Sequence, residues 1–92
     1  MTLKLKRTCE KHGTRISLSG ELRYPDLVEV YAEIEKAGRQ TTLDLDEVEV
    51  VDIDGIRLLN ECKDRGIQVV NCSPYIREWM LQETRNRQGE PG

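Results

Sequence analysis

Apolar and polar residues alternate along residues 43–51, and this stretch is the centre of the predicted fold. Leu43 and Leu45 alternate with aspartates, which is the period-two pattern of a strand with one apolar face. After a predicted turn, Val50 and Val51 form a second short β-branched run. The pattern therefore predicts two short strands, one after the other, in the middle of the chain.

A helix and a further strand follow at once. Residues 52–55 (Asp-Ile-Asp-Gly) open the helix, and Gly66 lies beyond its predicted end. The apolar positions of this helix recur at helical spacing, at Gly55, Leu58, Leu59 and Cys62. Residues 67–70 form the next predicted strand, and strand–helix–strand usually makes a right-handed parallel crossover. Because sites in such folds lie beyond the carboxyl ends of the strands, we look for function first at residues 52–55.

The preceding segment of the chain predicts a hairpin and a helix. Residues 2–10 and 14–19 both alternate, and together they form a predicted hairpin. Residues 19–22 are then expected to lead away from the sheet. Residues 25–37 carry apolar side chains on one helical face, and Gly38 fits the position after the helix end.

A last helix is predicted after the final strand. Ser73 fits its N-cap and Pro74 its first position, and the apolar stripe that follows consists of Ile76, Trp79 and Met80. Within this stripe, Trp79 is either a core residue or, if uncovered, an anchor for a partner or a second copy. The domain is therefore expected to span residues 1–83, with a polar, disordered tail over residues 84–92.

Taken together, these elements predict a small α/β domain. We expect a mixed sheet of about four strands, with three helices packed largely on one face. The 92 residues suffice for one core, and the net charge of −3 lacks the basic footprint of nucleic-acid binding. Apolar runs are too short for a spanning helix, and the 3 cysteines lack metal-ligand spacing. We therefore expect a cytoplasmic protein with free thiols.

Two segments together resemble the STAS domain, the fold shared by sulfate-transporter tails and bacterial anti-sigma factor antagonists. They are LDLDEVEVVDIDGIRLL, at residues 43–59, and VVNCSPYIREWM, at residues 69–80. The resemblance extends over about residues 16–80 and rests on the order and spacing of these motifs. It implies a protein-interaction domain that is not an enzyme and needs no cofactor or metal.

The chain departs from the family at one position of the motif. Where the family has a Ser or Thr that a partner kinase phosphorylates, directly after the motif Asp, this chain has Ile53. Asp54 occupies the neighbouring position and does not replace the phosphate. The partner-binding residues that the resemblance implies are Asp52, Ile53, Asp54, Gly55, Ile56 and Arg57. One of the two aspartates is also expected to cap the helix, which is compatible with binding.

Other site chemistries fit the sequence poorly. Acidic residues crowd residues 44–54, and Asp52, Asp54, Gly55 and Glu61 match positions of a calcium-binding loop, but Val50 stands where the first carboxylate ligand belongs. An aspartyl-phosphate site at Asp52 would lack the acidic pair and the lysine that such chemistry uses. His12 is near only one cysteine in the sequence, Cys9, and no acid–base set accompanies them. We therefore interpret the acidic run as a solvated face.

The resemblance leaves open which partner is bound. The first hypothesis is a regulator, similar to anti-sigma factor antagonists, that binds an anti-sigma factor of the serine-kinase type through residues 52–59 and thereby frees a sigma factor. The alternative is a cytoplasmic accessory subunit of an ABC-type lipid transporter, docked on the transporter ATPase. A third hypothesis is a homodimerisation module without a switching role.

Overall fold

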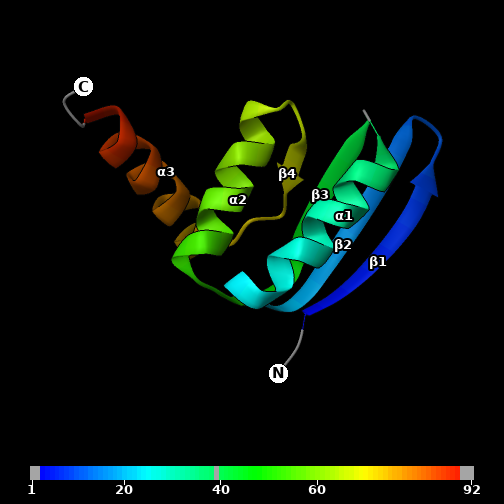
Figure 1. Cartoon of the computed structure of the whole chain (residues 1–92), viewed down its shortest axis with the longest axis horizontal. Coiled ribbons are helices and arrows are strands. Elements are labelled where there is room, and N and C mark those ends of the chain that lie inside the picture. Colours follow the sequence, from blue (N-terminus) through cyan, green and yellow to red (C-terminus); the bar gives the residue numbers. More distant parts are fainter. Residues whose placement is uncertain (1–2, 39, 90–92) are drawn as a thin grey trace.

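A four-stranded mixed sheet forms one layer of the molecule, and helices cover one of its faces (Figure 1). The computed structural model describes residues 3–38 and 40–89, with side chains described as far as residue 86. The strands lie side by side in chain order, and they are β1 (Leu3–Glu10), β2 (Gly13–Leu22), β3 (Thr41–Val51) and β4 (Gln68–Val70). β1 and β2 form the predicted antiparallel hairpin, whereas β2–β3 and β3–β4 are parallel pairs. The predicted fold class is confirmed.

The two parallel pairs are each joined by a helix that crosses the same face of the sheet (Figure 1). The helical elements are the 3-10 turn η1 (Tyr24–Asp26), α1 (Leu27–Ala37), α2 (Ile53–Asp64) and α3 (Pro74–Gly89). Because both crossovers step in the same direction along the sheet, their helices α1 and α2 fall on one side. α3 packs beside α2 and extends away from the sheet (Figure 1).

The core lies between the sheet and the helices and is built of aliphatic side chains, since the sequence contains no Phe. β2 and β3 each turn one face inward, and α2 turns its apolar stripe toward them. Full burial of such a side chain contributes about 1.5–3 kcal/mol. The largest fully buried side chains are Ile16, Leu18, Leu22, Leu43, Leu45, Ile56, Leu58, Leu59 and Ile76.

β3 is one continuous strand, so the predicted turn between Leu45 and Val50 was wrong. Its pairing with β2 shifts register twice, opposite Ser17/Ser19 and opposite Gly20/Glu21. Each shift places one extra residue in β3, which is the geometry of a β-bulge. The bulges allow buried positions to follow one another at a spacing of three along the second half of the strand. In the sequence, this spacing of the apolar residues interrupts the period-two pattern of a strand. The interruption therefore predicts a turn.

Two chain segments also continue further than the sequence predicted. Residues 19–22 remain in β2, where Gly20 pairs with Val48, and do not lead away from the sheet. α3 runs to Gly89, past the predicted start of the tail at Thr84. The residues after Thr84 include no Pro or Gly until Gly89, so nothing breaks the helix earlier. Residues 90–92 of the predicted tail lie outside the described residues.

The contact between α1 and α2 includes polar pairs that helical spacing alone did not reveal. Glu61 and Arg65 are four residues apart on α2, a spacing that favours an ion pair within the helix, but both side chains contact α1. The hydroxyl of Tyr31 donates to Glu61 Oε1 (2.9 Å), and Arg65 Nη2 donates to Glu35 Oε2 (3.4 Å). Burial, together with the hydrogen bond to Glu61, raises the pKa of Tyr31 to about 12.

Candidate partner-binding surface at the start of α2

α2 begins directly after β3, at the carboxyl end of the parallel strands, and Asp52 is its N-cap. The backbone of Asp52 is extended, with φ −101° and ψ 179°. Its Oδ1 accepts a hydrogen bond from the Gly55 N–H at 2.8 Å, which satisfies one of the free donors of the first turn. The capping role predicted for one of the two aspartates is therefore confirmed for Asp52.

The second carboxylate oxygen of Asp52 holds a different part of the chain. Oδ2 accepts a hydrogen bond from the Tyr24 N–H at 2.9 Å, and the Asp52 N–H donates to the Leu22 carbonyl at 3.2 Å. Asp52 thus joins the ends of β2 and β3 to the start of α2. Sequence reasoning did not identify Tyr24, because this contact is formed only when strands distant in the chain pair.

Gly55 allows the first turn of α2 to lie against the sheet. A Cβ atom at this position would stand 2.6 Å from Val51 Cγ2 and 2.7 Å from the Leu22 carbonyl oxygen. Neither distance leaves room for a methyl group, and the carbonyl belongs to the backbone of a central strand. Gly55 is thus the residue that permits this close helix–strand approach.

The six predicted partner-binding residues do not all reach the surface. Gly55 and Ile56 are buried, and Ile56 belongs to the core. Ile53 and Asp54 are half-buried at the first turn of α2, and Arg57 is exposed one turn later. Asp52 is also half-buried, but both of its oxygens accept hydrogen bonds within the protein. Ile53, Asp54 and Arg57 are therefore the members of the set whose side chains remain available to a partner.

Arg57 also ties α2 to the last helix. Its Nε donates to Glu83 Oε1 on α3 at 2.9 Å. The Glu83 side chain is only 10% exposed, whereas that of Arg57 is 57% exposed. The hydrogen bond and charge of Glu83, and to a smaller extent the charge of Asp54, raise the pKa of Arg57. The guanidinium thus remains charged at the edge of the surface while it covers a buried carboxylate.

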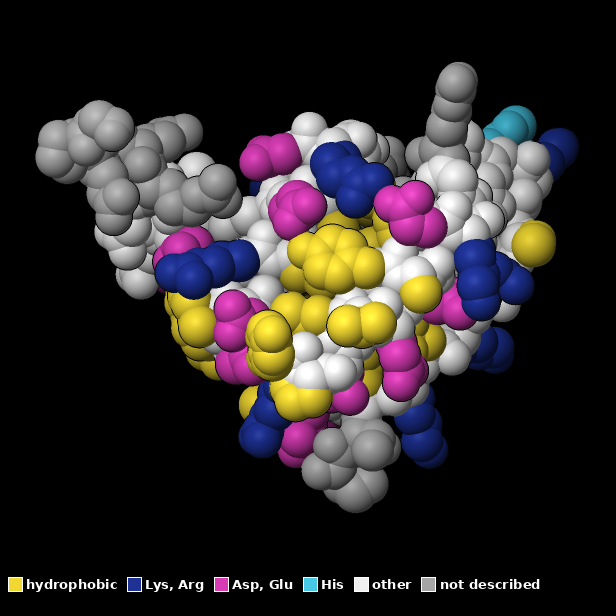
Figure 2. All heavy atoms as spheres, viewed as in Figure 1, with side chains coloured by type: hydrophobic (Ala, Val, Ile, Leu, Met, Phe, Trp, Pro, Cys, Tyr) yellow, Lys and Arg dark blue, Asp and Glu magenta, His cyan; other side chains and the backbone are white. Residues whose placement is uncertain are grey.

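Exposed apolar side chains lie on the segment that Asp52 holds in place. Tyr24 is 66% exposed, and Val28, on the first turn of α1, is 75% exposed. Figure 2 shows hydrophobic side chains over α1 and α2, surrounded by acidic and basic ones. We name Tyr24, Val28, Ile53, Asp54 and Arg57 the α2-start surface. An apolar centre with a charged rim is the usual composition of a protein contact surface.

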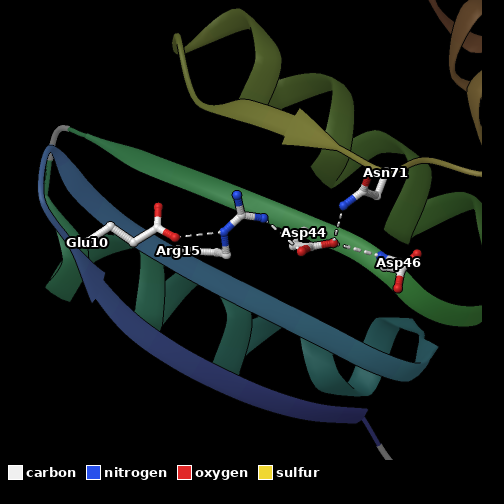
Figure 3. Close-up of polar contacts among 5 residues, drawn as sticks. All are labelled: Glu10, Arg15, Asp44, Asp46 and Asn71. Atoms are coloured by element: carbon white, nitrogen blue, oxygen red, sulfur yellow. Dashed lines mark hydrogen bonds and ion pairs between the residues drawn. The ribbon is translucent and has the colours of Figure 1, made fainter.

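The acidic run of β3 takes part in a polar network on the uncovered face of the sheet (Figure 3). Asp44 Oδ1 accepts hydrogen bonds from Asn71 Nδ2 (2.9 Å) and from the Asp46 N–H (3.0 Å), and Arg15 Nη1 donates to Oδ2 at 2.8 Å. Arg15 also contacts Glu10 at 3.1 Å. The Asn71 bond, followed by those from Asp46 and Arg15, lowers the pKa of the Asp44 carboxyl.

The metal-ligating and nucleophilic residue types lie in different surroundings in the described part of the chain. No group of three or more His, Cys, Asp or Glu side chains is placed to hold a metal ion there. The Cys62 thiol is buried in the core, and that burial raises its pKa to about 11. Cys9 is exposed near the hairpin turn, and Cys72 is half-buried. Among the described helices, none is both long and apolar enough to cross a membrane.

Comparison with known proteins gives no match, either to a protein-family model or to a curated protein. The protein is therefore classified by its fold and by the α2-start surface. It is a small α/β domain in which a helix start at the carboxyl edge of the sheet is held rigidly by Asp52. Apolar side chains beside that helix start are exposed.

Proposed function

We propose that this protein is a non-catalytic interaction domain of the bacterial cytoplasm, similar to anti-sigma factor antagonists. In this proposal the α2-start surface binds an anti-sigma factor of the serine-kinase type. The observation that carries the proposal is the arrangement of Asp52 and Ile53 at the start of α2. Both oxygens of Asp52 accept backbone N–H groups, while the half-buried Ile53 beside it offers an aliphatic side chain.

The hydrogen bonds of Asp52 favour binding over chemistry. A carboxylate that receives or donates a phosphoryl group must present an oxygen to the reacting phosphorus. Here Oδ1 is held by the Gly55 N–H and Oδ2 by the Tyr24 N–H. The cap therefore fixes the position of Ile53 and Asp54, and a preorganised surface loses less conformational entropy when it binds.

The apolar residues of the α2-start surface supply the contact area of the proposed interface. Tyr and large aliphatic side chains near the centre of an interface carry most of its binding energy when water is removed from them. Tyr24 and Val28 are exposed on one side of the helix start, and Ile53 lies at the helix start itself. Arg57 and Asp54 provide charges at the rim, which contribute more to specificity than to affinity.

The absence of a hydroxyl at position 53 determines how such a regulator is controlled. Phosphorylation at a helix start adds charge to the interface and repels a partner fitted to a neutral residue. Ile53 accepts no phosphate. We therefore propose that binding is constitutive at this surface and that the amount of the protein sets the response.

The proposal is tested by identifying and then perturbing the complex. The tagged protein is purified from its native cells, copurifying proteins are identified by mass spectrometry, and the recovered partner is titrated against the purified chain. Recovery of a kinase-type anti-sigma factor is the expected result. Recovery of an ABC ATPase with its permease would replace the proposal with the transporter subunit. Self-association alone would leave the dimerisation module.

Ile53→Asp is expected to weaken binding of the recovered partner by about 10-fold or more, because it places a charge in a desolvated contact. Its melting temperature should stay close to that of the wild type, because Asp in the first helical turn interacts favourably with the helix dipole. Tyr75→Asp is the matched control, since Tyr75 is an exposed apolar residue in the first turn of α3 and lies outside the α2-start surface. Equal affinity of the Ile53→Asp variant and the wild type would contradict the proposed interface.

Ile53→Ser gives an independent measurement of the same surface. With the recovered kinase and ATP, the serine variant should incorporate phosphate at position 53, whereas the wild type should not. Phosphorylation of the variant should then reduce its affinity for the kinase. A serine variant that binds the kinase but is never phosphorylated would show that the kinase active site does not face this helix start.

A further inference from the structure

The two edges of the sheet differ in how they are protected against pairing. β1 forms one edge and carries Lys4, Lys6 and Arg7, and such charges discourage an added strand. β4 forms the other edge, pairs with no described strand except β3, and consists of Gln68, Val69 and Val70 without a charge. Backbone groups of alternate β4 residues therefore point away from the sheet with no neighbouring strand.

A groove of about 460 Å³ lies beside the β4 edge. It exists because α3 packs on α2, where Asn60 Nδ2 donates to the Met80 carbonyl at 3.0 Å, and not on β4. The groove is also lined by apolar side chains, and Leu81 among them is 45% exposed. We name it the β4–α3 groove and define its apolar lining as Val69, Val70, Cys72, Met80 and Leu81.

Two cations stand at the β4–α3 groove without an acidic partner. Lys63 comes from α2 and Arg77 from α3, and both side chains are exposed. Neither forms an ion pair with any residue in the part of the chain that the structure describes. Both charges act on the Cys72 thiol and favour its ionised form. Burial has the larger effect and raises the pKa of that thiol. The groove is therefore locally basic on a protein whose net charge is −3.

We propose that the β4–α3 groove binds an extended acidic segment of a partner protein, which adds to the sheet as a strand beside β4. The free backbone groups of β4 would pair with the segment, and the apolar lining would receive alternate side chains. Carboxylates of the segment would contact Lys63 and Arg77. This surface is separate from the α2-start surface, so the inference does not depend on the proposed function.

The charges favour such a partner over a second copy of the chain. Pairing of β4 with β1 of another copy would bring Lys4 and Lys6 toward Lys63 and Arg77, and pairing of β4 with β4 would bring the same two cations together. Like charges in an interface cost binding free energy and slow association. An acidic segment would bring opposite charges to Lys63 and Arg77, which favours binding and speeds association.

The experiment uses synthetic peptides and the full chain. A six-residue peptide with alternating Glu and Val is titrated to about 1 mM, the range of weak peptide affinities, while backbone amide shifts are recorded by NMR. Two further peptides serve as controls, one with Lys in place of Glu and one with a central Pro, which cannot pair as a strand. We expect shifts at Val69, Val70 and Cys72 with the acidic peptide, and these should weaken as salt is raised.

The double variant Lys63→Glu and Arg77→Glu should lower the affinity for the acidic peptide by about 10-fold or more. The matched control is Lys4→Glu with Lys6→Glu, which changes the net charge equally at the opposite edge of the sheet and should leave the affinity unchanged. All four residues are exposed, so both double variants are expected to fold.

Three results would overturn the inference. The first is equal binding of the acidic and Lys-substituted peptides, and the second is shifts confined to β1 or absent at every residue. The third is a concentration-dependent dimer that shifts the β4 amides without peptide, measured by sedimentation. That result would assign the groove to a second copy of the chain.

Discussion

At Asp52, one carboxylate serves two segments that lie far apart in the sequence. Oδ1 accepts the Gly55 N–H of α2, and Oδ2 accepts the Tyr24 N–H of η1. Each N–H belongs to a first helical turn, where no carbonyl of the same helix is placed to accept it. This residue therefore contributes to stability and sets the shape of the α2-start surface at the same time.

Asp52→Ala is expected to lower the free energy of unfolding by about 1–2 kcal/mol, because the cap of α2 is lost. Asp52→Asn should cost less, since its amide oxygen still caps the helix while its amide nitrogen no longer accepts the Tyr24 N–H. Urea unfolding of the three proteins gives the comparison. An Asn variant as unstable as the Ala variant would show that the bond to Tyr24 matters more than the cap.

Gly55→Ala is expected to destabilise the protein by about 1–3 kcal/mol, because the added methyl meets Val51 and the Leu22 carbonyl. The higher helix propensity of Ala, up to ~1 kcal/mol, opposes this loss only in part. Gly66→Ala separates sterics from backbone strain, since its φ is +87° but no atom lies within 4 Å of the new Cβ. Thermal unfolding that ranks Gly55→Ala as the more stable of the two would contradict the close approach.

Among the elements, α3 depends on α2 for its position. It buries Ile76 and Met80, accepts a hydrogen bond from Asn60, and presents Glu83 to Arg57. Both hydrogen bonds come from α2, which is the element that α3 packs beside (Figure 1). An element held by one neighbour opens locally more easily than one held by several.

Arg57→Ala should loosen α3 selectively, because the nearly buried Glu83 carboxylate loses its partner. Amide hydrogen exchange is expected to accelerate in α3 while the amides of β2 and β3 keep their protection. Adding Glu83→Leu to the same chain should restore the protection, since no buried charge then remains. Uniform acceleration over the whole chain would instead indicate that α2 and α3 open together with the sheet.

Periodicity predicted the elements well because it reports which side chains face the core. The hairpin, both crossover helices and the Asp52 cap follow from alternation, helical spacing and residue type. The bulges of β3 could not be predicted in this way, because a register shift is a property of two paired strands. The same reason applies to Tyr24, whose contact with Asp52 appears only after β2 and β3 have paired.

At the scale of the molecule, the polar network on the uncovered face of the sheet makes stability depend on pH. Asp44 joins β2, β3 and the segment before α3 through Arg15, Asp46 and Asn71 (Figure 3). Its pKa is lowered from 3.8 in the folded protein. The network therefore stabilises the fold above pH 3.8, and this contribution is lost as the pH falls through the lowered pKa.

Asp44→Asn is expected to be less stable than the wild type at neutral pH, because it cannot carry the charge that Asn71 and Arg15 stabilise. The difference should shrink as the pH falls below 3.8, where the carboxyl of the unfolded wild type becomes protonated. Urea unfolding at a series of pH values measures the difference in the free energy of unfolding between the two proteins. Asp46→Asn is the control for removing an exposed acid. A difference that is independent of pH would show that Asp44 acts through packing alone.

The order of the strands has a consequence for how the protein is made. Each strand pairs with the strand before it in the chain, from β1 to β4. During synthesis, every strand that leaves the ribosome finds its neighbour already present at the growing edge of the sheet. No strand has to wait for a later one or insert between two that are paired. The described strands can thus be assembled in the direction of translation, with β4 joining after the other three.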